Sequence, residues 1–352
     1  MTRLGAPRRI YRQTVETLLI GAAGGMILNS VGFPAGLISG SVLAVAIASL
    51  AGRPRGIPQP LARVIFVLSG IAIGSAVSPQ TLHSIVDYPV SIAVLVCATA
   101  VMTAGTWAYL RTVHRWDPMS ALYGASPGGL AQMLVLSAEA GADVRAIVVV
   151  QTVRVVVLTL GIPAGLAVFG LAGQSAAVSG RPVAAPPELL LMVAVSVASA
   201  LVLQRLRFPG GLIFGAMVGS AFLHGGGFVT GGLPWGVAAT VMVALGTVNG
   251  SRFAGTDRRM LLHYFGAACG SFAVAAGLAV CFASLAARLL PVPAADIVIA
   301  YAPGAQDTML LLALALKLDP VFVGAHHLAR FLTVSLTVPF IARALPSLRE
   351  GS

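Results

Sequence analysis

The sequence predicts an all-α polytopic membrane protein made of two inverted repeats, each with about five transmembrane helices and one broken or re-entrant Pro-Gly segment. Three observations lead to this prediction. First, 57% of the 352 residues are hydrophobic and 9% are charged, whereas about a quarter of the residues of a soluble domain are charged. Second, a Pro-Gly motif occurs twice, half a chain apart. Third, the arginines between the apolar segments fit a second copy of inverted orientation.

The duplication is clearest at the Pro-Gly motif. Residues 126–133 read SPGGLAQM and residues 302–309 read APGAQDTM, so that Pro127 recurs as Pro303. This displacement, half the length of the chain, is called the repeat shift below. It relates further pairs on both sides of the motif: Gly70 and Gly246, Gly74 and Gly250, Asp143 and Asp319, Arg154 and Arg330, Pro163 and Pro339. An internal repeat of this kind predicts two copies of one structural unit.

Each copy contains a series of apolar segments. In the first copy they cover about 15–31, 35–52, 60–78, 88–110, 119–140 and 144–170. In the second they cover about 188–204, 209–226, 231–250, 260–287, 295–317 and 320–343. Residues 1–170 are therefore predicted as the first membrane repeat and residues 188–352 as the second. Residues 171–187, which are rich in Gly, Ser, Ala and Pro, are predicted as the linker.

The orientation of the copies follows from their charges, because cytoplasmic loops of membrane proteins are enriched in Lys and Arg. With an even number of crossings per copy, Arg205, Arg207 and the arginines of segment 252–259 would lie outside the cell. An odd number places them inside with the basic N-terminus, and leaves mainly Arg181, Arg288 and Lys317 outside. We therefore expect a multi-pass protein of the bacterial cytoplasmic (inner) membrane with both termini in the cytoplasm.

An odd number of crossings requires one segment in each copy that does not cross. The Pro-Gly segments 119–140 and 295–317 are the best candidates, because Pro and Gly break a helix near its middle. Broken backbone at membrane depth is tolerated where it is buried in protein or lines a wet cavity. A broken full span, with a different short segment that fails to cross, fits the charges as well.

The two breaks also form the predicted substrate site. The helix that starts after each break offers free backbone N–H groups and the positive end of its dipole, which together bind anions. Secondary transporters bind substrate and coupling ions at discontinuous helices of this kind. The alternative is that Pro and Gly only kink or pack the helices. The predicted substrate-binding residues are Pro127, Gly128, Gly129, Gln132, Arg154, Pro303, Gly304, Gln306 and Arg330.

Arg154 and Arg330 each lie roughly ten residues into an apolar helix, where a charge costs several kcal/mol unless it faces a partner or water. Gln151 and His327 precede them by three residues, and His326 precedes Arg330 by four, so these side chains share a helix face. Two interpretations remain open. The arginines supply positive charge to an anion site, or they donate hydrogen bonds to carbonyls that the nearby helix break exposes.

Asp307 is a carboxylate inside the second break motif, where the first copy has Ala131. Together with Thr308 and His327, it is predicted to bind the coupling ion, either sodium or a proton. The alternatives for Asp307 are a helix N-cap or a salt bridge to Arg330.

Two further sets of residues have structural predictions. Asp143 and Asp319 occupy equivalent turns and are predicted as helix caps. Cys97, Cys269 and Cys281 lie in apolar segments without metal-ligand spacing, and are predicted as small buried side chains.

These motifs resemble those of the AbrB-type membrane protein family, which is also labelled as ammonia monooxygenase or as a membrane regulator. The resemblance rests on the two Pro-Gly motifs and on the segment from Asp319 to Arg330, and it covers nearly the whole chain. The family pattern has Pro-Gly-Gly in both copies, where this chain has Ala305 in the second. It often has an acidic residue before the Met, where this chain has Gln132 and Thr308. The resemblance implies a fold similar to inverted-repeat carriers for organic anions and to sodium–proton exchangers.

The predicted function is a secondary transporter of a small anionic solute, with the lipid bilayer and the solute as partners and with homodimer formation left open. The rival is a membrane-embedded regulator of gene expression that acts through a partner, as the family label implies. Direct nucleic-acid contact is not expected, because the loops are too short for a helix-turn-helix. An ammonia monooxygenase is less favoured, since it needs copper or iron ligands and the histidines are scattered except for His326 and His327. We therefore expect no enzyme, no cofactor and no metal.

Overall fold

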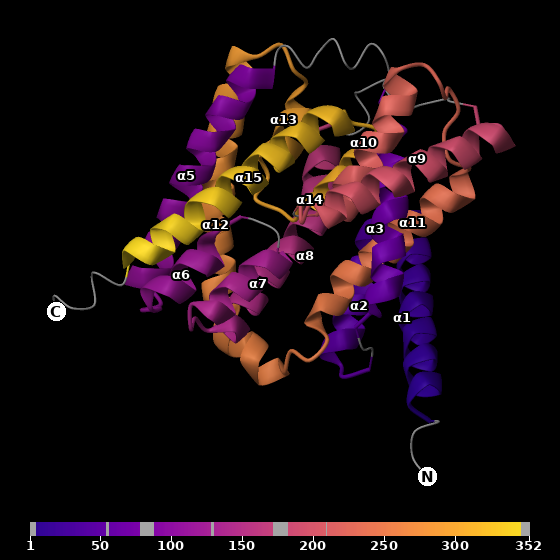
Figure 1. Cartoon of the computed structure of the whole chain (residues 1–352). Helices are drawn as coiled ribbons and strands as arrows, with labels where there is room; N and C mark the ends of the chain where they lie inside the picture. Colours follow the sequence, from indigo (N-terminus) through magenta and orange to yellow (C-terminus); the bar gives the residue numbers. More distant parts are fainter. Residues whose placement is uncertain are drawn as a thin grey trace. The chain divides into compact units, whose positions relative to one another are not determined.

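The computed structural model describes residues 5–53, 56–77, 88–127, 130–171, 182–208 and 210–345. Within these ranges every regular element is a helix (Figure 1), apart from one isolated parallel bridge between Val183 and Gly232. Five of the described helices are long and apolar enough to cross a membrane: α5, α8, α9, α12 and α15. The predicted all-α polytopic membrane protein is therefore confirmed.

The described part of the first half contains five helices and one broken segment. The helices are α1 (Gly5–Ser30), α2 (Gly36–Leu50), α3 (Gln59–Gly74), α5 (Tyr88–Thr112) and α8 (Val144–Val168). The broken segment consists of α6 (Pro118–Ala125) and α7 (Leu130–Glu139).

The second half repeats this order with α9 (Pro186–Arg205), α10 (Gly211–Gly225), α11 (Trp235–Gly250), α12 (Arg258–Leu289), α13 (Ala294–Tyr301), α14 (Gln306–Ala315) and α15 (Pro320–Ala344). A short 3-10 helix, η2 (Ser251–Phe253), follows α11. From α6 to α8 the elements have 8, 10 and 25 residues, and from α13 to α15 they have the same lengths. The starts of these two runs, Pro118 and Ala294, are related by the repeat shift. The opposite orientation of the two halves stays a prediction.

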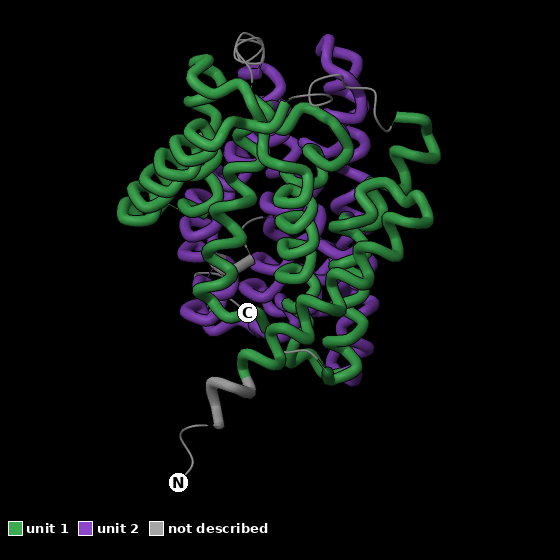
Figure 2. The backbone as a smooth tube through the Cα atoms, turned by 90° about the vertical axis from the view of Figure 1, so that its right-hand side faces the viewer, with its two compact units in different colours: residues 1–83, 159–257, 310–321 green, residues 84–158, 258–309, 322–352 purple. Residues whose placement is uncertain are grey.

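The chain forms two compact units, and each takes helices from both halves (Figure 2). Unit 1 comprises residues 1–83, 159–257 and 310–321, and unit 2 comprises residues 84–158, 258–309 and 322–352. Unit 1 therefore contains α1 to α3 with α9 to α11, while unit 2 contains both broken segments up to Met309 in α14. The predicted boundaries at 170 and 188 divide the chain by its sequence repeat, whereas the two units divide it by spatial contacts. The repeat boundaries stay a prediction. Residues 172–181 of the predicted linker lie outside the described residues.

Close helix packing explains the recurrent glycines in unit 1. α11 packs on α2, and a Cβ at Gly246 would lie 2.7 Å from the carbonyl oxygen of Ile38. A Cβ at Gly250 would lie 2.6 Å from the carbonyl oxygen of Val42. Gly70 and Gly74 on α3 approach α10 in the same way. Small residues four apart let two membrane helices come close together, so these four positions set the helix spacing in unit 1.

Unit 2 has its own apolar core around the first broken segment. Leu122 and Tyr123 on α6, Met133 on α7, Ile147 on α8 and Val334 on α15 are all buried in one cluster. The cluster packs the broken segment against two long helices and thereby fixes the positions of their polar side chains.

The caps of α8 and α15 agree with the sequence prediction. Oδ1 of Asp143 accepts hydrogen bonds from the backbone N–H groups of Arg145 and Ala146, at 3.0 and 3.1 Å. Oδ1 of Asp319 accepts from the N–H of Val321 at 2.8 Å. Both carboxylates therefore satisfy free N–H groups at a helix start, and the prediction that they are caps is confirmed.

The glycine packing can be tested on α11. Gly250→Leu is expected to lower the free energy of unfolding by about 1–3 kcal/mol, because the larger side chain overpacks the α2 contact. Thermal unfolding in detergent measures this change. Gly236→Leu on the same helix is the control, since nothing lies within 4 Å of a Cβ at that position. Equal unfolding temperatures for the two variants would contradict the packing account.

Candidate functional site

The second broken segment is fully described. α13 ends at Tyr301, the chain passes through residues 302–305 without helical structure, and α14 begins at Gln306. Pro303 has no N–H group to continue the helix, and its side chain is buried. In the first copy Ser126 and Pro127 are likewise buried at the break. The predicted site residues Gly128 and Gly129, and the side chain of Gln132, lie outside the described residues.

Two polar side chains on α8 bind the end of α6. Nε2 of Gln151 donates a hydrogen bond to the carbonyl oxygen of Tyr123 at 2.9 Å. A terminal nitrogen of Arg154 donates to the carbonyl oxygen of Gly124, also at 2.9 Å. The three-residue spacing on α8 thus matches two consecutive carbonyls in the last turn of α6, which have no partner within the helix.

The same arrangement recurs on α15. Nε2 of His327 donates to the carbonyl oxygen of Ile299 at 3.0 Å, and the guanidinium of Arg330 donates to the carbonyl oxygens of Ala300 and Ala302. Because a carbonyl oxygen only accepts hydrogen bonds, Nε2 of His327 carries the proton.

The two sets of hydrogen bonds correspond residue by residue. Tyr123 and Ile299, which bind Gln151 and His327, are related by the repeat shift. The same holds for the carbonyl residues that bind Arg154 and Arg330. The prediction that the arginines bind carbonyls exposed by the breaks is therefore confirmed. Gln151 and His327 are different residue types, but each donates a hydrogen bond to an equivalent carbonyl oxygen. The role of His327 in binding a coupling ion stays a prediction.

The two arginines bring two buried positive charges into unit 2. The side chains of Arg154 and Arg330 are 3% and 2% exposed. Neither forms an ion pair within the described part of the chain, and Nε of each has no hydrogen-bond partner there. A salt bridge between Asp307 and Arg330, one alternative from the sequence, is not found. Buried charges of one sign are costly unless an opposite charge accompanies them.

The residues at the start of α14 add further polar groups. Oδ1 of Asp307 accepts from the backbone N–H of Thr308 at 2.9 Å, and both side chains are buried. Oε1 of Gln306 is buried and has no hydrogen-bond partner among the residues that the structure describes. A carboxylate in the first turn is stabilised by the positive end of the helix dipole.

The structure also assembles a polar network that the sequence reasoning did not find. Ser91 on α5, Tyr301 on α13 and His326 on α15 are all fully buried. Nε2 of His326 lies 2.7 Å from Oγ of Ser91, and the hydroxyl of Tyr301 donates to the carbonyl oxygen of Ser91 at 2.8 Å. A comparison of the two copies could have drawn attention to these positions, because each polar residue corresponds to an apolar one at the repeat shift.

The cysteine prediction is wrong. Cys97, Cys269 and Cys281 are free and exposed on the protein surface, and α5 and α12, which carry them, are candidate membrane spans. Their small apolar side chains suit a lipid-facing surface as well as a core. In the described ranges no three His, Cys, Asp or Glu side chains are grouped so that they could hold a metal ion.

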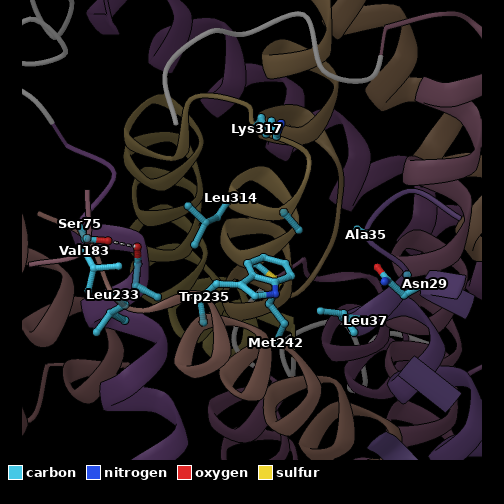
Figure 3. Close-up of a pocket in the computed structure, with 15 residues that line it drawn as sticks. Asn29, Ala35, Leu37, Ser75, Val183, Leu233, Trp235, Met242, Leu314 and Lys317 are labelled. Atoms are coloured by element: carbon cyan, nitrogen blue, oxygen red, sulfur yellow. Dashed lines mark hydrogen bonds between the residues drawn. The ribbon is translucent and has the colours of Figure 1, made fainter. Parts of the chain in front are cut away.

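A cavity of about 500 Å³ lies within unit 1 (Figure 3), lined mainly by apolar side chains. Trp235 and Met242 contribute from one face of α11, Asn29 from the end of α1, and Lys317 from the turn after α14. None of the predicted site residues is among the described residues that line it. The polar chemistry of the breaks therefore belongs to unit 2, and this cavity is a separate feature.

The shared role of Gln151 and His327 leads to a direct test. His327→Gln is expected to keep the stability of the protein, because glutamine already fills this role in the first copy. His327→Leu is expected to lower the free energy of unfolding by about 1–3 kcal/mol, since it leaves the buried carbonyl of Ile299 without a donor. Thermal unfolding of the two variants compares them. Equal losses in both variants would contradict the assigned role.

Comparisons with known proteins agree with this architecture. The model of the AbrB family, described as "Transition state regulatory protein AbrB", matches residues 37–346. A relative from Escherichia coli (strain K12), provisionally named as the regulator AbrB, is 29% identical over 90% of this chain and 93% of its own length. The uncharacterized protein YhjN of Bacillus subtilis (strain 168) is 25% identical over 92% of this chain and 91% of its own length. No solved structure matches the chain significantly. The chain belongs to the AbrB family.

Proposed function

We propose that this protein is a secondary transporter of a small anionic solute, which binds in unit 2 beside the two helix breaks. Arg154 and Arg330 neutralise the solute, and the chain around Pro127 and Pro303 forms the walls of its site. The protein works in the bacterial inner membrane with both termini in the cytoplasm.

The observation that carries this proposal is the pair of buried guanidinium groups without an anionic partner. A neutral donor is sufficient to satisfy a helix carbonyl, as the amide of Gln151 does at Tyr123. Arg154 and Arg330 add two positive charges where hydrogen bonding alone does not require them, and both retain an unpartnered Nε–H group within the described residues. A bound anion would accept hydrogen bonds from such groups and neutralise their charge.

The start of α14 supports the same site. Its first N–H groups have no partners within the helix, and the positive end of the dipole favours negative charge. Gln306 provides an unpartnered side-chain oxygen there, and its amide provides donors to a solute. The predicted site residue Gly304 is half-buried in the same break.

Coupling to an ion is the second element of the proposal. Asp307 and Thr308 place a buried carboxylate and a buried hydroxyl in the first turn of α14. Oxygen ligands of these kinds suit sodium, and the carboxylate alone suits a proton. His327 lies on α15, with its Nε2–H committed to the carbonyl of Ile299.

A membrane-embedded regulator that acts through a partner is the second candidate. The description of the AbrB family and the name of its Escherichia coli relative favour it. A regulator of this kind would still need a ligand or signal to sense, so the buried arginines are compatible with it. An oxygenase is a third and less favoured candidate.

The anion site is tested with purified protein and a panel of acetate, succinate, sulfate and phosphate. At least one of these anions is expected to raise the unfolding temperature of the wild type, because a ligand of the folded state stabilises it. The same labelled anion is expected to show counterflow in proteoliposomes. Arg154→Gln and Arg330→Gln are each expected to weaken anion binding by roughly tenfold or more, because a hydrogen bond to a charged group is lost. Both the thermal shift and the counterflow are therefore expected to fall.

Arg343→Gln is the matched control, because it removes the same charge from an exposed position on α15. Unchanged counterflow in folded Arg154→Gln and Arg330→Gln would contradict the transporter. Altered gene expression without any transport in the same variants would favour the regulator.

The orientation of the second half is tested by cysteine labelling in a variant without the three exposed native cysteines. Leu206→Cys is expected to be protected from a membrane-impermeant reagent in intact cells, and Arg288→Cys is expected to react, because both side chains are exposed and lie on opposite predicted sides. Labelling of Leu206→Cys from outside would contradict the inverted topology.

A further inference from the structure

The polar network at His326 has a defined arrangement of protons. Nδ1 of His326 lies 2.7 Å from the carbonyl oxygen of Phe322, which only accepts hydrogen bonds, so Nδ1 carries a proton. In the neutral ring Nε2 is then an acceptor, and the hydroxyl of Ser91 donates to it at 2.7 Å. The lone pair of Nε2 is therefore the place where the ring takes up a further proton.

The network can hold that additional proton without losing a hydrogen bond. The protonated ring would donate from Nε2 to Oγ of Ser91, whose own hydrogen would turn toward the hydroxyl oxygen of Tyr301, 3.4 Å away. The hydroxyl of Tyr301 would continue to donate to the carbonyl oxygen of Ser91. Each donor of the network thus has an acceptor in both states of the ring.

Packing does not require this network, because the other copy of the repeat fills the equivalent positions with apolar residues. At the repeat shift, Ser91, Tyr301 and His326 correspond to Ala267, Ala125 and Val150, and all three of these apolar residues are buried. Polar and ionisable groups inside a membrane protein are costly and are typically functional. The three polar residues form a single network, whereas their three counterparts are all apolar.

The network adjoins one of the two buried arginines. Arg330 follows His326 by one helical turn and interacts with it electrostatically. Arg330 also binds the carbonyls of Ala300 and Ala302, the residues on either side of Tyr301. An anion bound to Arg330 would therefore affect protonation of His326 in two ways, through its charge and through the backbone on either side of Tyr301.

The ionisable groups that face His326 are known from each element that packs on it. α5 contributes Tyr88, whose ring centre lies 6.0 Å from that of His326, and α13 contributes Tyr301, at 6.1 Å. On α15 the neighbours are His327 and Arg330. Burial of the ring is the main factor that opposes its protonation, and the positive charge of Arg330 opposes it further.

We infer that His326 is a proton-binding residue besides Asp307, and that a proton on Nε2 binds together with an anion on Arg330. This inference rests on the proposed function and makes the protein a proton–anion symporter. An anion at Arg330 cancels the positive charge that opposes protonation, and a protonated ring in turn strengthens anion binding. By linkage each ligand raises the affinity for the other by the same factor, on the order of tenfold.

The first test uses sulfate, because its charge does not change between about pH 5 and about pH 8, the range in which histidines titrate. Sulfate is expected to bind wild-type protein roughly tenfold more tightly at the lower pH, measured by the thermal shift. His326→Gln keeps an acceptor for Ser91 but cannot be protonated, and is expected to lose this pH dependence. His263→Gln, which removes an exposed histidine of α12, is the matched control and is expected to retain it.

Persistence of the pH dependence in His326→Gln, or its loss in His263→Gln, would overturn the inference. Sulfate binding of equal strength at both pH values in the wild type would overturn it as well.

The second test needs no anion and therefore separates this inference from the proposed function. Nuclear magnetic resonance of labelled histidine follows the ring of His326 in ligand-free protein. In Arg330→Gln the ring is expected to take up a proton at a higher pH than in the wild type. In Arg330→Lys, which keeps the positive charge, the ring is expected to titrate as in the wild type. An identical titration of His326 in all three proteins would overturn the inference, even if the protein transports anions.

Discussion

A helix that ends inside an apolar core leaves carbonyl groups without partners, and each costs free energy unless a donor reaches it. Unit 2 meets this constraint twice, at the ends of α6 and α13. The donors come from one face of α8 and one face of α15, and they reach equivalent carbonyls in both copies. The polar faces of two long helices follow from this single requirement, whereas the charge of the two arginines does not.

The guanidinium groups satisfy these carbonyls, and neither forms an ion pair within the described residues. Charge is what distinguishes Arg154 and Arg330 from the neutral donors Gln151 and His327 beside them. An anion accounts for the choice of arginine, and it also gives a reason for the network at His326. On the inference above, a proton binds to His326 more readily when an anion compensates the charge of Arg330.

Much of the architecture could be predicted from the sequence, because the internal repeat transfers each local signal from one copy to the other. Pro303 predicts the helix break, and Asp143 predicts a cap. The partners of Arg330 could not be predicted, since they depend on how α15 packs on α13. The polar network could not be predicted either, because Ser91 lies 235 residues from His326 and 210 residues from Tyr301 in the sequence. The exposed cysteines were misjudged because a helix that is apolar on all sides does not reveal which face meets lipid.

The central claim is that an anion binds between the buried arginines, and anomalous diffraction tests it most directly. Crystals of the protein grown in selenate, a heavier analogue of sulfate, would show the position of the bound anion. The account predicts an anomalous peak within hydrogen-bonding distance of the free Nε atoms of Arg154 and Arg330. Peaks confined to exposed arginines such as Arg343, with none at the buried pair, would contradict it.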